Sequence, residues 1–284
     1  MRRWEILQGD VRETLRALPE KTVQTCVTSP PYFGLRDYGV DGQIGLEPTP
    51  AEYVEQMVQV FREVRRVLRD DGTLWLNLGD SYANDGKWGG STGGKHAAGL
   101  HGDTSVGRER KHTGLKAKDL IGIPWRVAFA LQADGWYLRQ DIIWHKPNPM
   151  PESVRDRCTK AHEYVFLLSK SERYYWDAEA MQEPSSQPER AGKLERSFST
   201  GKPDAVLRQD VGRAVMRTET RNRRSVWTVA TRPYKGAHFA TFPPALIEPC
   251  ILAGAPFDGL VLDPFTGSGT TAAVGERIQY EAVE

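Results

Sequence analysis

The sequence predicts an α/β fold organised around one core, and three observations lead to that prediction. Short strand-like runs alternate with longer amphipathic runs along most of the chain, which is the pattern of repeated βαβ units. One strand-like run near the C-terminus continues into a glycine-rich turn and then into a helix-like run. The chain has 284 residues, a length that fits one large α/β domain with an insertion.

In the first half of the chain, strands and helices alternate closely. Residues 4–7 read as a short strand before a helix from about Val11, and residues 23–27 read as the next strand. A long helix begins at the capping box of residues 49–52, TPAE, and is expected to stop at Gly72, before a strand over 73–78. Helical spacing puts six of its apolar side chains on one face, which indicates core packing: Tyr53, Met57, Val60, Phe61, Val64 and Val67.

The second half continues the same alternation, with two interruptions. The expected elements are a helix near 124–132, a strand over 136–144, a hairpin formed by 161–168 and 173–176, a helix over 242–252 and a last strand over 259–262. Residues 85–118 are glycine-rich without periodicity, so we expect a mobile loop there. Residues 183–224 also lack periodicity and are richer in arginine.

Charge and cysteine content narrow the class of protein. Residues 187–235 hold twelve Lys/Arg against five Asp/Glu, a net charge of +7 in a chain whose net charge is +1. Such a patch is typical of nucleic-acid contact and equally of a solvated loop. Three scattered cysteines form neither a disulfide framework nor a zinc-ligand pattern, so we expect a reducing cytoplasm and no metal. The absence of a long apolar stretch predicts no membrane span and no signal peptide.

The stretch TSPPY at residues 28–32 places two consecutive prolines where a strand ends. Proline fixes φ, lacks an N–H donor and forces the preceding residue into an extended conformation. By itself, this pattern indicates only a rigid turn after the strand.

The stretch DPFTGSGTT at residues 263–271 follows the last strand. Its glycines allow the backbone to approach a ligand, and the helix that follows offers free N–H groups to an anion. Gly267, Gly269 and Ala272 match the dinucleotide pattern G-x-G-x-x-A, which is a weak signal alone. A P-loop lysine is missing, and only fifteen residues follow Gly269, which argues against a nicotinamide enzyme with further sheet after this motif.

Together, the two motifs closely resemble those of the S-adenosylmethionine-dependent DNA amino-methyltransferases of the permuted β class, in which the catalytic motif precedes the cofactor motif. The resemblance covers nearly the whole chain, and its further blocks occur in the family's order: LQGDVRETLRALP, GTLWLNLGDSY, DIIWHKPNPMPESVRDR, HEYVFLLSKS and HFATFP. It implies a Rossmann-like methyltransferase fold with a mostly parallel seven-stranded sheet and one antiparallel strand. It also implies S-adenosyl-L-methionine as cofactor and double-stranded DNA as partner, with a homodimer possible.

The resemblance assigns roles to individual residues. Ser29 and the Pro30 carbonyl would accept the two hydrogens of the target amine, Pro31 would keep residue 30 extended, and Tyr32 would stack on a flipped base. An acidic residue would bind the ribose hydroxyls, with Glu284 the best match and Glu281 second. The other residues that would hold the cofactor are Asp10, Phe239, Ala240, Thr241, Asp263, Phe265, Gly267, Ser268 and Gly269.

The target base follows from the first residue of the catalytic motif. In the resembling family SPPY accompanies cytosine N4 and DPPY accompanies adenine N6, so the sequence favours cytosine N4, with adenine N6 as the close alternative. Cytosine C5 chemistry would need a thiolate, and Cys250 lies in an apolar helical run typical of a core. A catalytically silent DNA-binding protein is a further alternative, against which the intact TSPPY and GSGTT argue.

The predicted organisation is one catalytic domain with an insertion. Residues 1–182 and 236–284 would form its catalytic and cofactor-binding parts, and 183–235 would recognise the DNA site in a restriction-modification context. Four arginines in this segment could contact phosphates or guanine edges: Arg217, Arg221, Arg223 and Arg224.

Overall fold

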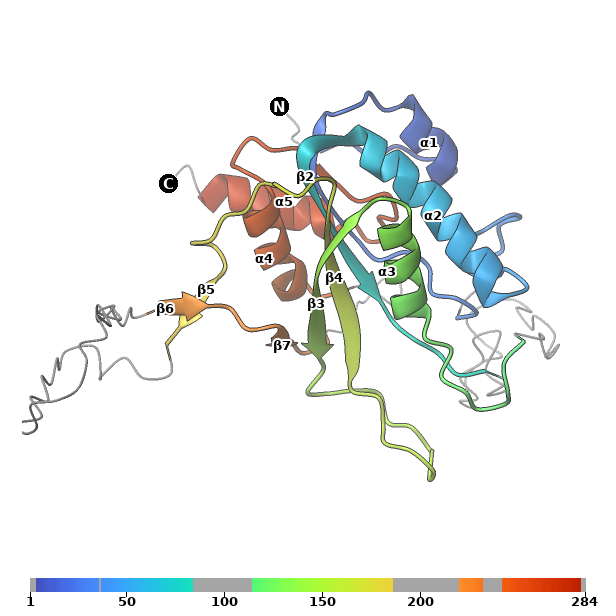
Figure 1. Ribbon diagram of the computed structural model, residues 1–284. Coiled ribbons are helices and arrows are strands. Elements are labelled where there is room, and N and C mark those ends of the chain that lie inside the picture. Colours follow the sequence, from blue (N-terminus) through green and yellow to red (C-terminus); the bar gives the residue numbers. More distant parts are fainter. Residues whose placement is uncertain (1–3, 36, 84–113, 186–219, 232–241, 282–284) are drawn as a thin grey trace, which may run out of the picture.

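The computed structural model describes residues 4–35, 37–83, 114–185, 220–231 and 242–281. Its main sheet has the strand order β7-β3-β4-β2-β1-β8 and lies between two layers of helices (Figure 1). The strands are β1 (Val23–Thr28), β2 (Leu68–Leu78), β3 (Tyr137–His145), β4 (His162–Ser169), β7 (Val226–Thr228) and β8 (Val261–Leu262). A separate two-stranded sheet joins β5 (Gln182–Pro184) to β6 (Thr220–Asn222).

The sheet is parallel except for one strand. β1 pairs in parallel with β2 and β8, and β3 pairs in parallel with β7. β4 lies between β2 and β3 and is antiparallel to both. The expected fold class, a mostly parallel sheet with one antiparallel strand, is therefore confirmed, with six strands in the described part of the chain where the sequence predicts seven.

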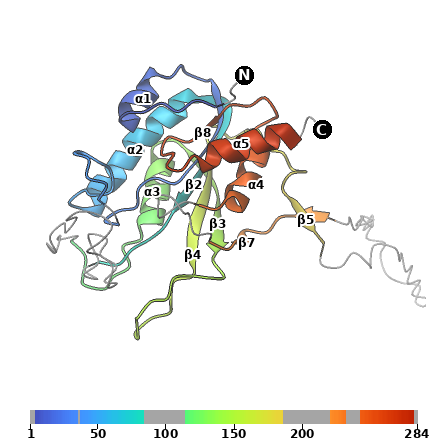
Figure 2. The same ribbon diagram turned by 180° about the vertical axis from the view of Figure 1, so that it is seen from behind.

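Five helices cover the two faces of the sheet in the described residues. α1 (Val11–Ala17), α2 (Pro50–Val67) and α3 (Ile123–Ala133) lie on one face, and α4 (Pro244–Gly254) and α5 (Thr270–Glu281) lie on the other (Figures 1 and 2). Alternate side chains of β2 point to opposite sides, because Leu74 and Leu76 belong to the core cluster under α2 whereas Trp75 belongs to the cluster under α4. The six apolar side chains predicted to line α2 are all fully buried.

The start of the chain differs from the prediction. Residues 4–8 have no regular secondary structure, and Trp4, Ile6 and Leu7 are largely exposed. An apolar run becomes a strand only where a neighbouring strand offers its edge, and the nearest edge of the sheet is the two-residue β8. The predicted strand over 4–7 was therefore wrong.

The long helix ends earlier than predicted. The capping box is present, since the Thr49 hydroxyl accepts a hydrogen bond from the Glu52 N–H at 3.2 Å. The helix stops at Val67 because Leu68 is already extended and pairs with Val23 of β1. Gly72 lies inside β2, at an irregularity in the pairing with β1, where an added Cβ would approach the Gln24 carbonyl oxygen to 3.0 Å.

The predicted hairpin of 161–168 with 173–176 does not form. Both edges of β4 are already occupied by β2 and β3, so no edge remains for residues 173–176. These residues instead run past the irregular part of β2, where the Tyr175 N–H donates to the Asp71 carbonyl at 2.9 Å. The ring of Trp176 stacks on that of Trp75, with centroids 6.0 Å apart.

No helix in the described ranges is long and apolar enough to cross a membrane.

We predict that Gly254→Ala lowers the free energy of unfolding by about 1–3 kcal/mol. α4 meets the sheet at Gly254, where an added Cβ would lie 2.6 Å from Thr25 Oγ1 and 2.9 Å from Trp75 Nε1. The helix must therefore move away from the sheet. Urea denaturation measures the change, and Gly275→Ala in α5 is the matched control because its added Cβ would meet nothing within 4 Å. Equal stability of the two variants would contradict the close approach.

Candidate active site

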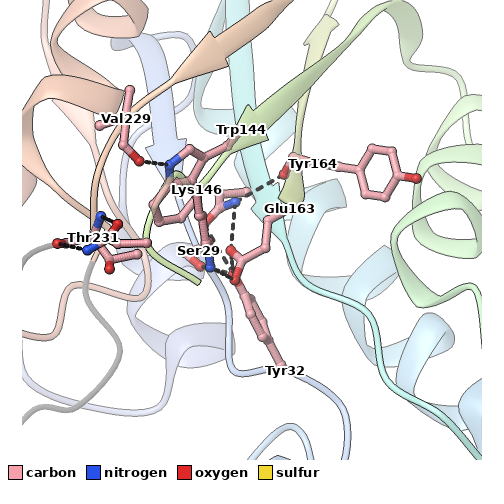
Figure 3. A network of polar contacts seen from close by, with 10 residues as sticks. Ser29, Tyr32, Trp144, Lys146, Glu163, Tyr164, Val229 and Thr231 are labelled. Atoms are coloured by element: carbon pink, nitrogen blue, oxygen red, sulfur yellow. Dashed lines mark hydrogen bonds and ion pairs between the residues drawn. The ribbon is translucent and has the colours of Figure 1, made fainter. Parts of the chain in front are cut away.

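Polar side chains from four strands meet at one edge of the main sheet. Ser29 and Tyr32 follow the end of β1, Asn77 lies near the end of β2, and Lys146 directly follows β3. Glu163 is the second residue of β4, which runs in the opposite direction, so it reaches the same edge (Figure 3). The carboxyl ends of parallel strands are where open α/β sheets bind their ligands.

The Tyr32 hydroxyl is the centre of this group. It lies 2.7 Å from Glu163 Oε2, 3.1 Å from Asn77 Oδ1 and 3.4 Å from Ser29 Oγ. Lys146 Nζ forms an ion pair with the other oxygen of Glu163. Burial, followed by the negative charge of Glu163, raises the pKa of Tyr32 well above its usual value, so the hydroxyl keeps its proton.

The core holds the double proline of the TSPPY stretch in place. Pro30 is buried, and the Pro31 carbonyl accepts a hydrogen bond from the hydroxyl of Tyr53 at 2.9 Å. Tyr53 is itself fully buried in α2. No described residue donates to the Pro30 carbonyl. The backbone of this turn is therefore anchored at residue 31 and has an acceptor at residue 30.

The ring of Tyr32 is also fixed from one side. A Cβ added at Gly79, just after β2, would come within 2.5 Å of Tyr32 Cε2. The absence of a side chain at residue 79 thus lets the Tyr32 ring lie against the backbone at the end of β2. Together with the hydroxyl contacts, this sets the plane of the ring.

Asp263 connects the two predicted motifs. Its carboxylate accepts hydrogen bonds from Thr28 Oγ1 and Thr271 Oγ1, both at 2.7 Å, and from the Phe265 N–H at 3.2 Å. Burial raises the pKa of Asp263, and the two hydroxyl hydrogen bonds oppose that rise. Asp263 therefore ties the end of β1 to β8 and to the first turn of α5, across 235 positions of sequence.

The turn at 267–269 leaves open space beside this tie. Gly269 has φ +76°, and no atom lies within 4 Å of the position that its Cβ would occupy. α5 begins at the next residue with free N–H groups, and Ser268 Oγ lies 2.9 Å from Thr270 Oγ1. Gly267 is exposed and Phe265 packs against the core. An open turn with backbone donors and hydroxyls fits a polar cofactor such as S-adenosylmethionine.

Asp10 lies in a different local setting. It caps α1 through a 2.8 Å hydrogen bond from the Arg12 N–H and forms an ion pair with the Arg12 side chain at 2.6 Å. The hydrogen bond from the Arg12 side chain lowers the pKa of Asp10 to about 2. No hydrogen bond among the described residues joins Asp10 to the 263–271 turn. Phe239, Ala240, Thr241, Glu284 and the side chain of Glu281 lie outside the described residues.

The predicted DNA-binding arginines have partners within the protein. Arg221 and Arg224 both donate to Glu183 Oε1, at 2.9 and 2.8 Å. The guanidinium of Arg223 lies 4.6 Å from the centre of the Trp227 ring. Arg217 lies outside the described residues. The hairpin of β5 and β6 that carries these contacts projects away from the main sheet in both views (Figures 1 and 2).

The site also contains residues to which the sequence assigned no role. Asn77, Lys146 and Glu163 lie in the blocks LNLGDSY, WHK and HEYVF, and each is a polar residue at the end of an apolar strand. That position was the signal that could have identified them. Asp80 has a structural task, because it accepts hydrogen bonds at 3.0 Å from the N–H groups of Gly122 and Ile123 and so caps α3.

Thiol and metal chemistry find no support among the described residues. Cys26 and Cys250 are buried, and burial raises the pKa of both thiols. Cys158 is exposed. No group of three or more His, Cys, Asp or Glu side chains within the described ranges could hold a metal ion.

The chain is similar to proteins of one family. The family model described as DNA methylase matches residues 23–283. Type II methyltransferase M.SmaI of Serratia marcescens is 47% identical over 289 residues, covering 100% of this chain and 86% of that protein. Type II methyltransferase M.Cfr9I of Citrobacter freundii is 48% identical over 281 residues, covering 98% of this chain and 82% of that protein.

Solved structures share the fold. The PvuII DNA methyltransferase, titled cytosine-N4-specific, superposes with a TM-score of 0.59 at 20% identity over 95% of this chain and 76% of that chain. A DNA modification methylase of Thermus thermophilus, solved in complex with S-adenosyl-L-methionine, gives a TM-score of 0.55 at 22% identity over 95% of this chain and 82% of that chain.

We predict that Thr271→Val lowers the free energy of unfolding by about 1–3 kcal/mol at pH 7, because it removes a donor from a buried carboxylate. The loss should shrink as the pH falls through the raised pKa of Asp263, since the protonated acid needs fewer donors. Thermal denaturation across a pH series measures this. Thr22→Val, which removes an exposed hydroxyl, is the control, and a pH-independent loss would contradict the role of the Asp263 charge.

Proposed function

This chain belongs to the DNA methylase family of N6 and N4 methyltransferases, and within it we propose that the chain methylates N4 of cytosine in double-stranded DNA. S-adenosylmethionine is the cofactor of the family. The observation that carries the proposal is the position of Ser29 and Pro30. They stand at the end of β1, and the Thr28–Asp263 hydrogen bond joins that end to the open glycine turn.

The exocyclic amine of a base is a poor nucleophile, because its lone pair is delocalised into the ring. We propose that Ser29 Oγ and the Pro30 carbonyl each accept one amine hydrogen, which favours a tetrahedral nitrogen with its lone pair directed at the methyl group. The Tyr53 hydrogen bond to Pro31 would hold this acceptor pair still. When bound, S-adenosylmethionine supplies a methyl group activated by a sulfonium. The protein would then contribute mainly alignment of amine and methyl group.

The target base must leave the duplex before it can reach Ser29. Flipping costs a few kcal/mol, and stacking on an aromatic ring returns about 1–3 kcal/mol. Tyr32 would provide that ring, and its plane is already set by Gly79 and the hydroxyl contacts. The cofactor would lie at the 263–271 turn. We propose that Phe239, Ala240, Thr241 and an acidic residue at Glu284 or Glu281 complete its site, with Asp10 near the adenine only if Arg12 releases it.

The choice of cytosine N4 rests on a neutral serine where the N6 enzymes of the family carry aspartate. The PvuII methyltransferase, which shares the fold, is titled cytosine-N4-specific, and this agrees with the choice. Adenine N6 is the second candidate, because its amine presents the same two hydrogens. Cytosine C5 is disfavoured by the burial of Cys26 and Cys250.

The DNA-recognition insertion is proposed to be shorter than the sequence alone suggested. β7, at 226–228, pairs with β3 and so belongs to the main sheet. We therefore place the insertion at 183–225. Glu183 holds Arg221 and Arg224 together at its base, and DNA phosphates would compete with this carboxylate for the two guanidinium groups.

We predict that the purified protein, given S-adenosylmethionine and duplex DNA, forms N4-methylcytosine, measured by mass spectrometry of the digested nucleosides. Ser29→Ala and Tyr32→Ala should abolish or strongly reduce product while cofactor affinity stays near that of the wild type, because both residues would face the base. N6-methyladenine as product would replace the proposed base. A loss of cofactor binding in Tyr32→Ala as severe as its loss of activity would overturn its role.

We also predict that the double variant Arg223→Gln/Arg224→Gln weakens DNA binding. The log–log salt slope should fall by about one unit for each phosphate that the protein no longer neutralises. Gel-shift titrations on several duplexes at several salt concentrations measure this, beside a cofactor-binding assay that should not change. Arg62→Gln, an exposed arginine of α2 paired with Asp134, is the control. Unchanged DNA affinity at every salt concentration would make this segment a solvated loop.

A further inference from the structure

A line of side chains crosses the candidate site from β3 to Ser29. Trp144 Nε1 donates to the Val229 carbonyl at 2.8 Å, and Lys146 Nζ lies 4.2 Å from the centre of the Trp144 ring (Figure 3). Lys146 then pairs with Glu163, and Glu163 accepts from the Tyr32 hydroxyl. Each member therefore has a defined partner on both sides.

The Lys146–Glu163 pair differs from the other ion pairs of the described residues. Its side chains are only 18% and 16% exposed, and no other pair in the described ranges has both members below a fifth. A buried ion pair is often no more stabilising than apolar residues of the same volume. Its place beside Tyr32 therefore calls for a reason other than stability.

The direction of hydrogen bonding along this line follows from the donor inventory. A carboxylate accepts only, so the Tyr32 hydroxyl donates to Glu163 Oε2 at 2.7 Å. The hydroxyl has one hydrogen, and the shorter, charge-assisted contact takes it in preference to Asn77 Oδ1 at 3.1 Å. The amide of Asn77 is oriented by its own donation to the Tyr164 carbonyl at 3.0 Å.

The lone pairs of the Tyr32 oxygen are then left for Ser29. Ser29 Oγ donates its hydrogen to this oxygen across 3.4 Å, a long contact of the kind that tightens when substrate is bound. With its hydrogen directed at Tyr32, the Ser29 oxygen has only lone pairs to present on its other side. A hydroxyl hydrogen directed into the site would instead engage the nitrogen lone pair that must attack.

We propose that Glu163, paired with Lys146, is a positioning residue that orders hydrogen bonding through Tyr32 to Ser29, so that Ser29 presents only acceptors to the substrate amine. This inference rests on the proposed function, because it concerns the amine that Ser29 would bind. It gives the line of Lys146, Glu163 and Tyr32 a part in the orientation of one hydrogen atom. The Tyr32 ring keeps its separate part in stacking.

A double-mutant cycle tests the line. Glu163→Gln replaces the acceptor by a near-isosteric amide that can also donate, and Tyr32→Phe keeps the ring but removes the hydroxyl. Each should lower the single-turnover rate of methyl transfer by about 10–100-fold at saturating cofactor and DNA, a range typical of losing one polar group that supports catalysis. Because both break the same line, the double variant should be no slower than the slower single variant. Multiplying effects would overturn the inference.

A second pair of variants separates orientation from folding. Glu163→Gln alone leaves Lys146 buried without its partner, which should lower the melting temperature. Adding Lys146→Met to Glu163→Gln should restore the melting temperature but not the rate. Recovery of the rate together with stability would mean that Glu163 is only structural. Glu63→Gln, which breaks the half-exposed pair with Arg66 on α2, is the control and should leave the rate unchanged.

The same measurements keep this inference distinct from the proposed function. Cofactor affinity, from calorimetry, should stay within about twofold of the wild type in every variant, since the line faces the base. A wild type that methylates adenine would overturn the proposed base, yet the cycle would still decide the role of Glu163 because both amines carry two hydrogens. A wild type that methylates neither base would overturn both.

Discussion

The reversed direction of β4 is the constraint on which the candidate site depends. β4 lies between β2 and β3, with Trp144 opposite Glu163 and Leu78 opposite Tyr164. Its first residues therefore stand where its neighbours end. A parallel strand of the same eight residues would place this carboxylate at the other edge of the sheet, roughly 25 Å away. Tyr32 would then have no charged acceptor, and Lys146 would have no carboxylate beside it.

The second constraint is the pairing of β1 with β8, because it makes the order of the motifs along the chain unimportant. The two strands lie side by side, with Thr25 opposite Val261 and Cys26 opposite Leu262. Their ends are joined by the hydrogen bond between Thr28 and Asp263. A buried carboxylate with three donors is stable only in one arrangement of these donors, so Asp263 holds the amine-binding turn and the glycine turn in one fixed relation.

The basic segment shows why a net charge does not by itself define a binding surface. Arg221 and Arg224 converge on Glu183, and Arg223 lies over Trp227. An anion that approaches these groups must compete with a carboxylate already in place, at surface positions where each ion pair contributes about 0–1 kcal/mol. That competition is weak enough for polyanionic DNA to win.

Local sequence determined much of this protein. Capping residues, helical spacing and apolar runs predicted α2, β1, α3 and α4, and the two quoted motifs located both halves of the candidate site, because these features depend on near neighbours in the chain. The errors have one cause. Residues 4–7 and 173–176 look like strands, and Gly72 looks like a helix stop, but free sheet edges and the pairing of Leu68 with Val23 are set by distant segments. For the same reason only the tertiary structure could bring Glu163 to Tyr32, since that contact spans 131 positions and depends on the direction of β4.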